Sequence, residues 1–133
     1  IEDQMVHSNW MPNIILCINR GGCIPGVYLS HRLRTTHETL DIRLRDHITK
    51  PNLSVLEKAF AFQKKILIID DINDTGDTFN YIVENFGKGD DRIRFATLIH
   101  NKPSKAKVDY HGYTIDKSKN PAWIVFPWEE WDK

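Results

Sequence analysis

The segment at residues 66–78, with the sequence ILIIDDINDTGDT, constrains the fold of this chain more than any other feature. Residues 65–69 form a β-branched, apolar run between charged residues, which predicts a buried strand. Two carboxylates, Asp70 and Asp71, follow directly, then a loop of small and polar residues, and then an apolar pattern over 79–86 that suits a helix. A strand that delivers acids to its C-terminal end ahead of a helix is typical of an open α/β sheet, where ligands bind beyond the carboxyl ends of the strands.

The remaining apolar segments alternate between strand-like and helix-like patterns along the chain. Residues 13–18 (NIILCI) predict a buried strand ending in a glycine-containing loop, and the apolar spacing over 24–33 predicts a helix. A further strand is expected at the start of 39–54, whose remainder forms an exposed loop, and later strands are expected over 94–100, 113–115 and 123–126. Strands that alternate with helices indicate one α/β domain over residues 1–133, with a mostly parallel central sheet flanked by helices.

Composition and charge exclude several classes of protein. The chain has 133 residues, and 18 basic residues balance 18 acidic ones, so no net charge draws it towards nucleic acid or a membrane surface. No apolar run approaches the roughly 20 residues that span a bilayer, and no signal-peptide pattern opens the chain. Cys17 and Cys23 lack a second pair, so neither a zinc site nor a disulfide framework is expected. We therefore expect a cytoplasmic protein with neither membrane nor nucleic acid among its partners.

The polar loop after the two acids has the chemistry of a phosphate site. Thr75, Gly76 and Thr78 can present backbone amides and hydroxyls close to the N-terminus of the expected helix, where a phosphate dianion is stabilised. Asp70 and Asp71 can bind ribose hydroxyls or a hydrated Mg²⁺, directly or through water. The segment therefore predicts that a sugar phosphate binds at the carboxyl edge of the sheet.

The same segment resembles the phosphoribosyl-pyrophosphate signature of the type I phosphoribosyltransferases, in which an apolar strand and two acids precede DTGxT. A loop that merely tops a core strand is the structural alternative. A receiver domain also ends a strand in paired acids, but no DTGxT loop follows them there. The resemblance implies the type I phosphoribosyltransferase fold with a small C-terminal hood over about 101–133, Mg²⁺ as cofactor, and assembly into homodimers or homotetramers.

The resemblance also assigns roles within the signature. It implies that Asp74 is the catalytic acid that faces N7 of the base and takes or stabilises its proton. The 5′-phosphate of phosphoribosyl pyrophosphate is then held by the loop residues Thr75, Gly76, Asp77 and Thr78. Asp77, at the variable position of DTGxT, is a departure from the family pattern. Its negative charge lies near the expected 5′-phosphate and would weaken phosphate binding unless the side chain points outward.

A second match, INRGGCIPG at residues 18–26, is similar to the family's pyrophosphate loop. Arg20 supplies positive charge there, and Gly21 allows the diphosphate to approach the backbone closely. The resemblance also implies a non-proline cis peptide, although RGG taken alone is an ordinary turn. By resemblance, Lys58 is a basic residue near pyrophosphate and residues 41–54 are a flexible closing loop. Three basic residues of that loop either reach the diphosphate or form a solvated stretch: Arg43, Arg45 and Lys50.

A third match, at the C-terminal end, concerns the base. HNKP at residues 100–103 and WIVFPWE at 123–129 resemble the xanthine-guanine type of 6-oxopurine phosphoribosyltransferase. The resemblance implies that a lysine binds the exocyclic O6, an aromatic stacks on the ring, a backbone contacts it and an acid accepts from a ring NH or 2-amino group: Lys102, Trp123, Ile124 and Glu129, respectively. Stacking recognises purines in general, whereas the lysine selects a 6-oxo over a 6-amino group. As structural alternatives, Lys102 is a solvated lysine at a turn and Trp123 is a core aromatic.

Together the matches imply an enzyme that joins guanine, xanthine or hypoxanthine to phosphoribosyl pyrophosphate in purine salvage, releasing pyrophosphate. Three alternatives stay open: a phosphoribosyltransferase for another base, a non-catalytic RNA-binding sensor of phosphoribosyl pyrophosphate, and a plain nucleotide-binding module. Lys102 and Trp123 argue against another base, and the balanced charge gives the sensor no support. The region before Asn13 looks short for the family, so a leading helix is expected to be absent.

Overall fold

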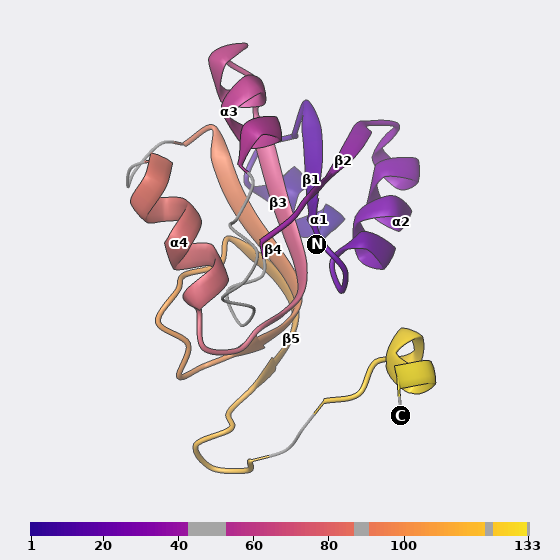
Figure 1. Ribbon diagram of the computed structural model, residues 1–133, viewed down its shortest axis with the longest axis vertical. Helices are drawn as coiled ribbons and strands as arrows, with labels where there is room; N and C mark the ends of the chain where they lie inside the picture. Colours follow the sequence, from indigo (N-terminus) through magenta and orange to yellow (C-terminus); the bar gives the residue numbers. More distant parts are fainter. Residues whose placement is uncertain (43–52, 87–90, 122–123, 133) are drawn as a thin grey trace.

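Five parallel strands form one sheet in the computed structural model, which describes residues 1–42, 53–86, 91–121 and 124–132. The order across the sheet is β2-β1-β3-β4-β5 (Figure 1). The strands are β1 (Ile14–Ile18), β2 (Thr36–Leu40), β3 (Ile66–Asn73), β4 (Ile93–Asn101) and β5 (Tyr110–Ile115). Because all five run in the same direction, their C-terminal ends meet at one edge, which is the lower edge in Figure 1.

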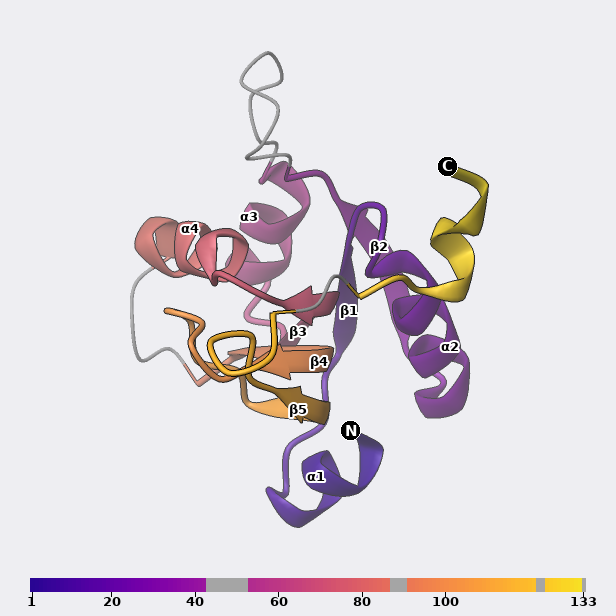
Figure 2. The same cartoon turned by 90° about the horizontal axis from the view of Figure 1, so that it is seen from below.

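Helices cover both faces of the sheet, as Figure 2 shows. On one face lie α1 (Glu2–His7) and α2 (Cys23–Leu33), and on the other lie α3 (Ser54–Ala61) and α4 (Asp77–Phe86). The inner strand β1 is buried along its whole length because helices cover it on both faces of the sheet. Its residues Ile15 and Cys17 pack with Met5 and Leu29, whereas its alternate residues pack towards α3 and α4. This two-sided burial explains the unbroken apolar runs that marked the strands in the sequence.

The expected α/β domain with a parallel sheet flanked by helices is confirmed. The strands and the helix predicted over 13–18, 94–100 and 24–33 appear within one or two residues of the expected bounds. The central strand β3, however, continues four residues beyond the apolar run to Asn73. It continues because Asp70 and the residues after it keep their parallel pairing with β4, as in Asp70 with Thr97.

Two expectations about the ends of the chain were wrong. A leading helix, α1, is present: Met5 on it is fully buried, and the side-chain amide of Gln4 exchanges hydrogen bonds of 2.7 and 2.9 Å with the backbone of His111 on β5. Residues 124–126 form no strand, and the chain then enters the 3-10 helix η1 (Pro127–Asp132). Pro121 and Pro127 flank this segment, and proline cannot donate to a strand ladder.

Helix α3 was not predicted from the sequence. It begins at Ser54, inside the loop expected over 41–54, and buries Leu56 and Ala59 against the sheet. The basic residues expected to close over the site, Arg43, Arg45 and Lys50, lie outside the described residues. Among the helices of the described residues, none has the length and apolar character needed to cross a membrane.

Candidate functional site

Two adjacent carboxylates lie where β3 extends beyond its pairing with β1. The pairing of β1 with β3 ends at Cys17 and Ile69, so Asp70 and Asp71 have β4 on one side only. Asp70 Oδ1 accepts the Asp71 amide at 2.8 Å, and Asp71 Oδ1 accepts the Ile72 amide at 2.8 Å. These bonds fix both carboxylates at the carboxyl edge of the sheet.

The environment of Asp70 suits a cation. Burial, and then the charge of neighbouring Asp71, raises the pKa of Asp70 well above its ordinary value. A nearby cation favours the ionised form of such a pair, and Mg²⁺ is commonly held by one or two carboxylates together with water and phosphate oxygens. The part of the chain that the structure describes holds no group of three or more His, Cys, Asp or Glu arranged for a metal. A Mg²⁺ ion on Asp70 and Asp71 would therefore take its other ligands from water or from a phosphorylated substrate.

The loop between β3 and α4 is a compact turn built from backbone groups. Gly76 has φ +93°, a conformation that other residues rarely adopt, and a Cβ placed on it would lie 2.5 Å from the Ala106 amide nitrogen. The Lys105 amide donates to the Thr75 carbonyl at 2.9 Å, so the crossover segment between β4 and β5 supports this turn from behind. The backbone amides of the first turn of α4 follow directly, which makes the loop a suitable cradle for an anion.

The side chains of this loop are compatible with that cradle. Thr75 Oγ1 accepts the Asp77 amide at 3.3 Å, which caps the start of α4. Asp77 is exposed in the first helical turn, where a negative charge favours the helix. Thr78 is partly buried beside it. Because Asp77 is exposed, solvent screens its negative charge.

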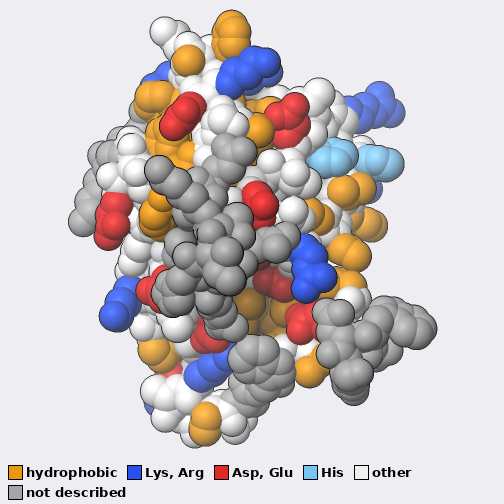
Figure 3. Space-filling model, viewed as in Figure 1, with side chains coloured by type: hydrophobic (Ala, Val, Ile, Leu, Met, Phe, Trp, Pro, Cys, Tyr) orange, Lys and Arg blue, Asp and Glu red, His pale blue; other side chains and the backbone are white. Residues whose placement is uncertain are grey.

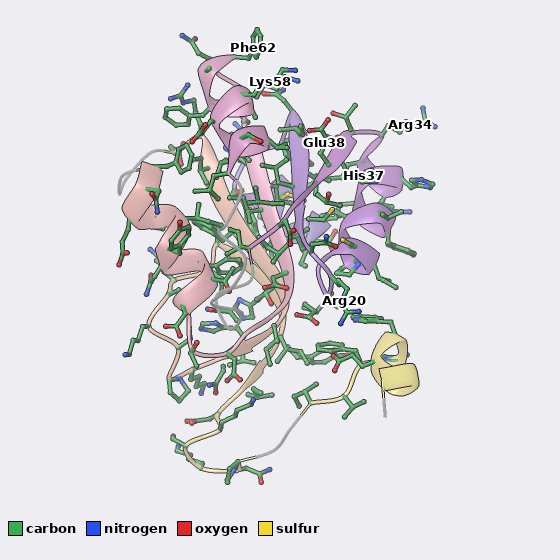
Figure 4. The ribbon with its side chains drawn as sticks, in the orientation of Figure 1. Arg20, Arg34, His37, Glu38, Lys58 and Phe62 are labelled. Atoms are coloured by element: carbon green, nitrogen blue, oxygen red, sulfur yellow. The ribbon has the colours of Figure 1, made fainter. Side chains whose placement is uncertain are left out.

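The glycine loop after β1 lies against the acid pair. The Asn19–Arg20 peptide bond is cis, as the resemblance implied. A Cβ on Gly21 would overlap the Asp71 carboxylate, so the lack of a side chain at Gly21 lets this loop lie close to the acids. Arg20 is exposed at the same end of the sheet (Figure 4). The structure therefore brings Arg20 and Gly21 together with the acids of β3.

Lys58 does not join this group. It is an exposed residue on α3, and Figure 4 shows it near Phe62 at the top of the view, whereas Arg20 lies well below it. The described structure therefore separates Lys58 from the loop with which the sequence resemblance grouped it.

Asp74 is the centre of a polar network that joins three segments. Its Oδ2 lies 2.8 Å from Lys117 Nζ, and the two side chains are 25% and 20% exposed. Asn101 Nδ2 donates to Asp74 Oδ1 at 3.2 Å and to the Asp74 carbonyl at 3.1 Å. Asn101 Oδ1 accepts the Lys117 amide at 2.9 Å. An acid, Asp74, and a cation, Lys117, thus lie side by side next to the loop of residues 75–78. Both residues are hydrogen-bonded to the buried Asn101.

The predicted base-binding residues are only partly brought to this network. The Lys102 amide donates to the Ile115 carbonyl at 2.9 Å while its side chain is exposed. Ile124 and Glu129 are partly buried in the C-terminal segment, which leaves β5 and ends on the α2 side of the molecule. Trp123 lies outside the described residues. Within that segment Phe126 and Trp128 stack with their centroids 4.8 Å apart, and Trp128 Nε1 is buried without a partner in the described structure.

Sequence reasoning missed Lys117, Asn101 and Asn73. The available signal was positional: each residue lies at or just after the C-terminal end of a parallel strand, and such ends meet at one edge of a sheet. Asn101 ends β4, Asn73 ends β3 and Lys117 follows β5. Position along the chain does not indicate which of the two lysines, Lys102 or Lys117, reaches Asp74.

Charge on the visible surface is mixed. On the face in Figure 3, the described Lys and Arg side chains are scattered among acidic ones and form no continuous basic stripe. An extended basic surface is the usual mark of a protein that grips nucleic acid. This face therefore gives no support to an RNA-binding role.

Comparison with known proteins agrees with this geometry. The phosphoribosyl transferase domain family matches residues 2–132. Among solved structures, the chain is similar to a purine phosphoribosyltransferase from Pyrococcus horikoshii, with 28% identity, a TM-score of 0.68, and coverage of 96% of this chain and 83% of that one. The Helicobacter pylori xanthine-guanine-hypoxanthine phosphoribosyltransferase has 21% identity, a TM-score of 0.70 and coverage of 96% and 82%. A hypothetical protein from Neisseria gonorrhoeae with bound ppGpp has 19% identity, a TM-score of 0.73 and coverage of 98% and 81%. The last two show likeness of fold alone.

Proposed function

The chain belongs to the phosphoribosyl transferase domain family, and from this premise we propose that it transfers the 5-phosphoribosyl group of phosphoribosyl pyrophosphate to a 6-oxopurine. Guanine, xanthine or hypoxanthine is the acceptor, pyrophosphate is released, and the reaction belongs to purine salvage. The observation that carries the choice of base is the ion pair of Asp74 and Lys117, 2.8 Å apart, next to the loop of residues 74–78. The similar Pyrococcus horikoshii protein is itself a purine phosphoribosyltransferase.

The hydrogen-bonding pattern of the ion pair is complementary to the edge of a 6-oxopurine. N7 and O6 lie on the same edge of guanine, and a base protonated at N7 presents a donor beside an acceptor. Asp74 offers an acceptor and Lys117 a donor at neighbouring positions. A 6-amino group would set a donor against the lysine and leave that contact unmade, which is a strong basis for rejecting adenine.

Two lysines are candidates for the O6 contact. The sequence resemblance favours Lys102, whereas the contact to Asp74 favours Lys117. Trp123 is proposed to stack on the purine, Ile124 to contact it through its backbone and Glu129 to accept from its far edge. These assignments follow the resemblance, and the paired lysine variants in the Discussion decide between Lys102 and Lys117.

The proposed chemistry matches the arrangement of charges. Cleavage of the bond between C1′ and pyrophosphate develops positive charge on the ribose, which nearby carboxylates stabilise. Asp70 and Asp71 bind the ribose hydroxyls. The same two carboxylates would hold Mg²⁺, which would supply positive charge to the leaving diphosphate. The loop of Thr75, Gly76, Asp77 and Thr78 holds the 5′-phosphate, so that the base is aligned with C1′.

The remaining residues act on the leaving pyrophosphate and on the attacking base. Arg20 and Gly21 are proposed to contact the diphosphate, Arg20 through its charge and Gly21 through its backbone amide. Asp74 accepts the N7 proton as the base attacks C1′. Lys58 is left out of the proposed pyrophosphate contacts, because it lies away from Arg20, on α3 near Phe62.

A product assay tests the proposal. The protein is mixed with Mg²⁺, phosphoribosyl pyrophosphate and, separately, guanine, xanthine, hypoxanthine, adenine, orotate or uracil, and nucleotide and pyrophosphate are measured together. Metal-dependent nucleotide from at least one 6-oxopurine is expected, and omission of Mg²⁺ is the control. Turnover with adenine or a pyrimidine alone would point to another base. Binding of phosphoribosyl pyrophosphate without turnover of any base would point to the sensor.

A further inference from the structure

We propose that Asn101 is a positioning residue that orients the Asp74 carboxylate and ties it to the Lys117 segment; this inference rests on the proposed function. Asn101 is the last residue of β4 and is only 5% exposed. It contacts neither the acid pair on β3 nor the loop of residues 75–78 in any described hydrogen bond. Among the described residues, the Asn101 side chain donates to Asp74 and accepts from Lys117, so replacing that side chain is expected to act through these two residues.

The hydrogen bonds of Asn101 fix the orientation of its amide. The Asp74 carbonyl can only accept, so the group 3.1 Å from it is the NH₂ group, which also donates to Asp74 Oδ1 at 3.2 Å. The Lys117 backbone amide can only donate, so it faces the Asn101 side-chain oxygen at 2.9 Å. The side-chain amide therefore has only one chemically possible orientation. Its NH₂ group is bonded to Asp74, and its oxygen is bonded to Lys117, the other member of the ion pair.

The ion pair alone does not fix the carboxylate. Lys117 carries its charge at the end of a flexible side chain, so it can keep the ion pair with Asp74 in several orientations of the carboxylate. Asn101 grips both the backbone and Oδ1 of Asp74, which fixes the side chain relative to its own main chain. A displacement of about 1 Å at a reacting group can cost about 100-fold in rate. Asn101 prevents displacement of this kind.

A second buried asparagine provides a matched comparison. Asn73, 3% exposed at the end of β3, donates to the Ala106 carbonyl at 3.0 Å and accepts from Ser104 Oγ at 2.9 Å. It thus holds the crossover segment that supports Gly76, at the phosphate end of the site. The two asparagines are alike in burial and strand position but serve opposite ends of the site. Their variants should affect different kinetic constants.

The experiment is a double-mutant cycle in the full chain. Asn101→Ala and Asn101→Asp are combined with wild-type Asp74 and with Asp74→Asn, and kcat and KM are measured with the 6-oxopurine that the wild type uses best. We expect Asn101→Ala to lower kcat by about 10- to 100-fold and to leave the KM for phosphoribosyl pyrophosphate nearly unchanged. In the Asp74→Asn background the same change should cost little more, because the residue it positions is already disabled.

Asn101→Asp is a nearly isosteric second variant. It keeps the acceptor for the Lys117 amide but replaces the donor to Asp74 by a carboxylate oxygen, so it should lower kcat at least as much as Asn101→Ala. If Asn101→Ala fails to fold, as judged by circular dichroism, the cycle is completed with Asn101→Asp. Asn73→Ala, the matched variant, should instead raise the KM for phosphoribosyl pyrophosphate more than it lowers kcat.

Failures of the two proposals are distinguishable. A wild type that turns over a 6-oxopurine while Asn101→Ala retains full kcat, or costs the same factor in both Asp74 backgrounds, would overturn the positioning role and leave the proposed function standing. An Asn101 variant that loses phosphoribosyl-pyrophosphate affinity as strongly as Asn73→Ala would do the same. A wild type that binds phosphoribosyl pyrophosphate in calorimetry but forms no nucleotide with any base would overturn the proposed function itself, and the inference with it.

Discussion

The proposed phosphate end of the candidate site, at residues 75–78, and its proposed base end are built from different parts of the chain. The phosphate end consists of backbone groups around Gly76, supported by the backbone of Lys105 and Ala106. The base end consists of two side-chain charges, on Asp74 and Lys117. The first depends on shape, so it tolerates little change in backbone. The second depends on charge and position, so its chemistry can change while the fold is kept.

The largest expected effect is at the base end. Asp74→Asn keeps the size of the side chain but removes its negative charge, so it should lower kcat by about 100- to 10,000-fold, the usual range for loss of an acid-base group. Binding of phosphoribosyl pyrophosphate should change far less, because the loop of residues 75–78 is untouched. Steady-state kinetics and calorimetry on the same preparation check both values. Equal loss of turnover and of phosphoribosyl-pyrophosphate affinity would show that the two ends are not separate.

At the phosphate end, Gly76→Ala should act through the backbone. The new methyl group would meet the Ala106 amide nitrogen at 2.5 Å, and φ +93° is strained for alanine. We expect a loss of about 1–3 kcal/mol in the free energy of unfolding together with a higher KM for phosphoribosyl pyrophosphate. The control is Asp77→Ala, an exposed neighbour in the same loop, which should cost well under about 1 kcal/mol. If urea unfolding shows that both changes destabilise the protein equally, the loop does not depend on the backbone conformation at Gly76.

Paired lysine variants sharpen the comparison within the base end. Lys117→Met should lower kcat/KM for the 6-oxopurine by about 10-fold or more, since a hydrogen bond to a charged group contributes about 1.5–3 kcal/mol. Lys102→Met should have a smaller effect, because the Lys102 side chain is exposed and its described hydrogen bond is made by its backbone. Methionine keeps much of the length and apolar stem of lysine in both cases. The reverse ranking would assign the O6 contact to Lys102, as the sequence resemblance implied.

The same contrast explains what could be predicted from the sequence. The acids, the glycine turn and the start of α4 lie within residues 66–78, so one local pattern specified the strand, the loop and much of the phosphate end. The partners of Asp74 come from the ends of β4 and β5, and their contacts depend on tertiary packing. The strand expected over 123–126 was wrong for its described residues, 124–126, which form no strand. Their apolar character suited a strand, but Pro121 and Pro127 flank the segment and cannot donate to a strand ladder.

The smallest expected effect links pH to the phosphate end through His100. Asn73 Nδ2 lies 3.2 Å from His100 Nδ1, and because this amide group only donates, the ring nitrogen must accept and cannot carry a proton. Burial, and then the charge of His111, lowers the pKa of His100. In the unfolded chain the pKa of histidine is about 6.5, so the unfolded chain binds this proton at higher pH than the folded chain. Stability contributed by neutral His100 is complete above that pH and is lost progressively as the pH falls through the lowered pKa.

Replacing His100 by glutamine tests this linkage, because glutamine offers an acceptor that does not titrate. Between about pH 7 and pH 5 the urea midpoint should fall less steeply for His100→Gln than for the wild type. His31→Gln, a change at an exposed histidine on α2, is the matched control and should keep the wild-type slope. If the wild type also loses affinity for phosphoribosyl pyrophosphate over this range and His100→Gln does not, the proton acts on the phosphate end through Asn73. Parallel slopes for all three proteins would exclude His100 as the titrating group.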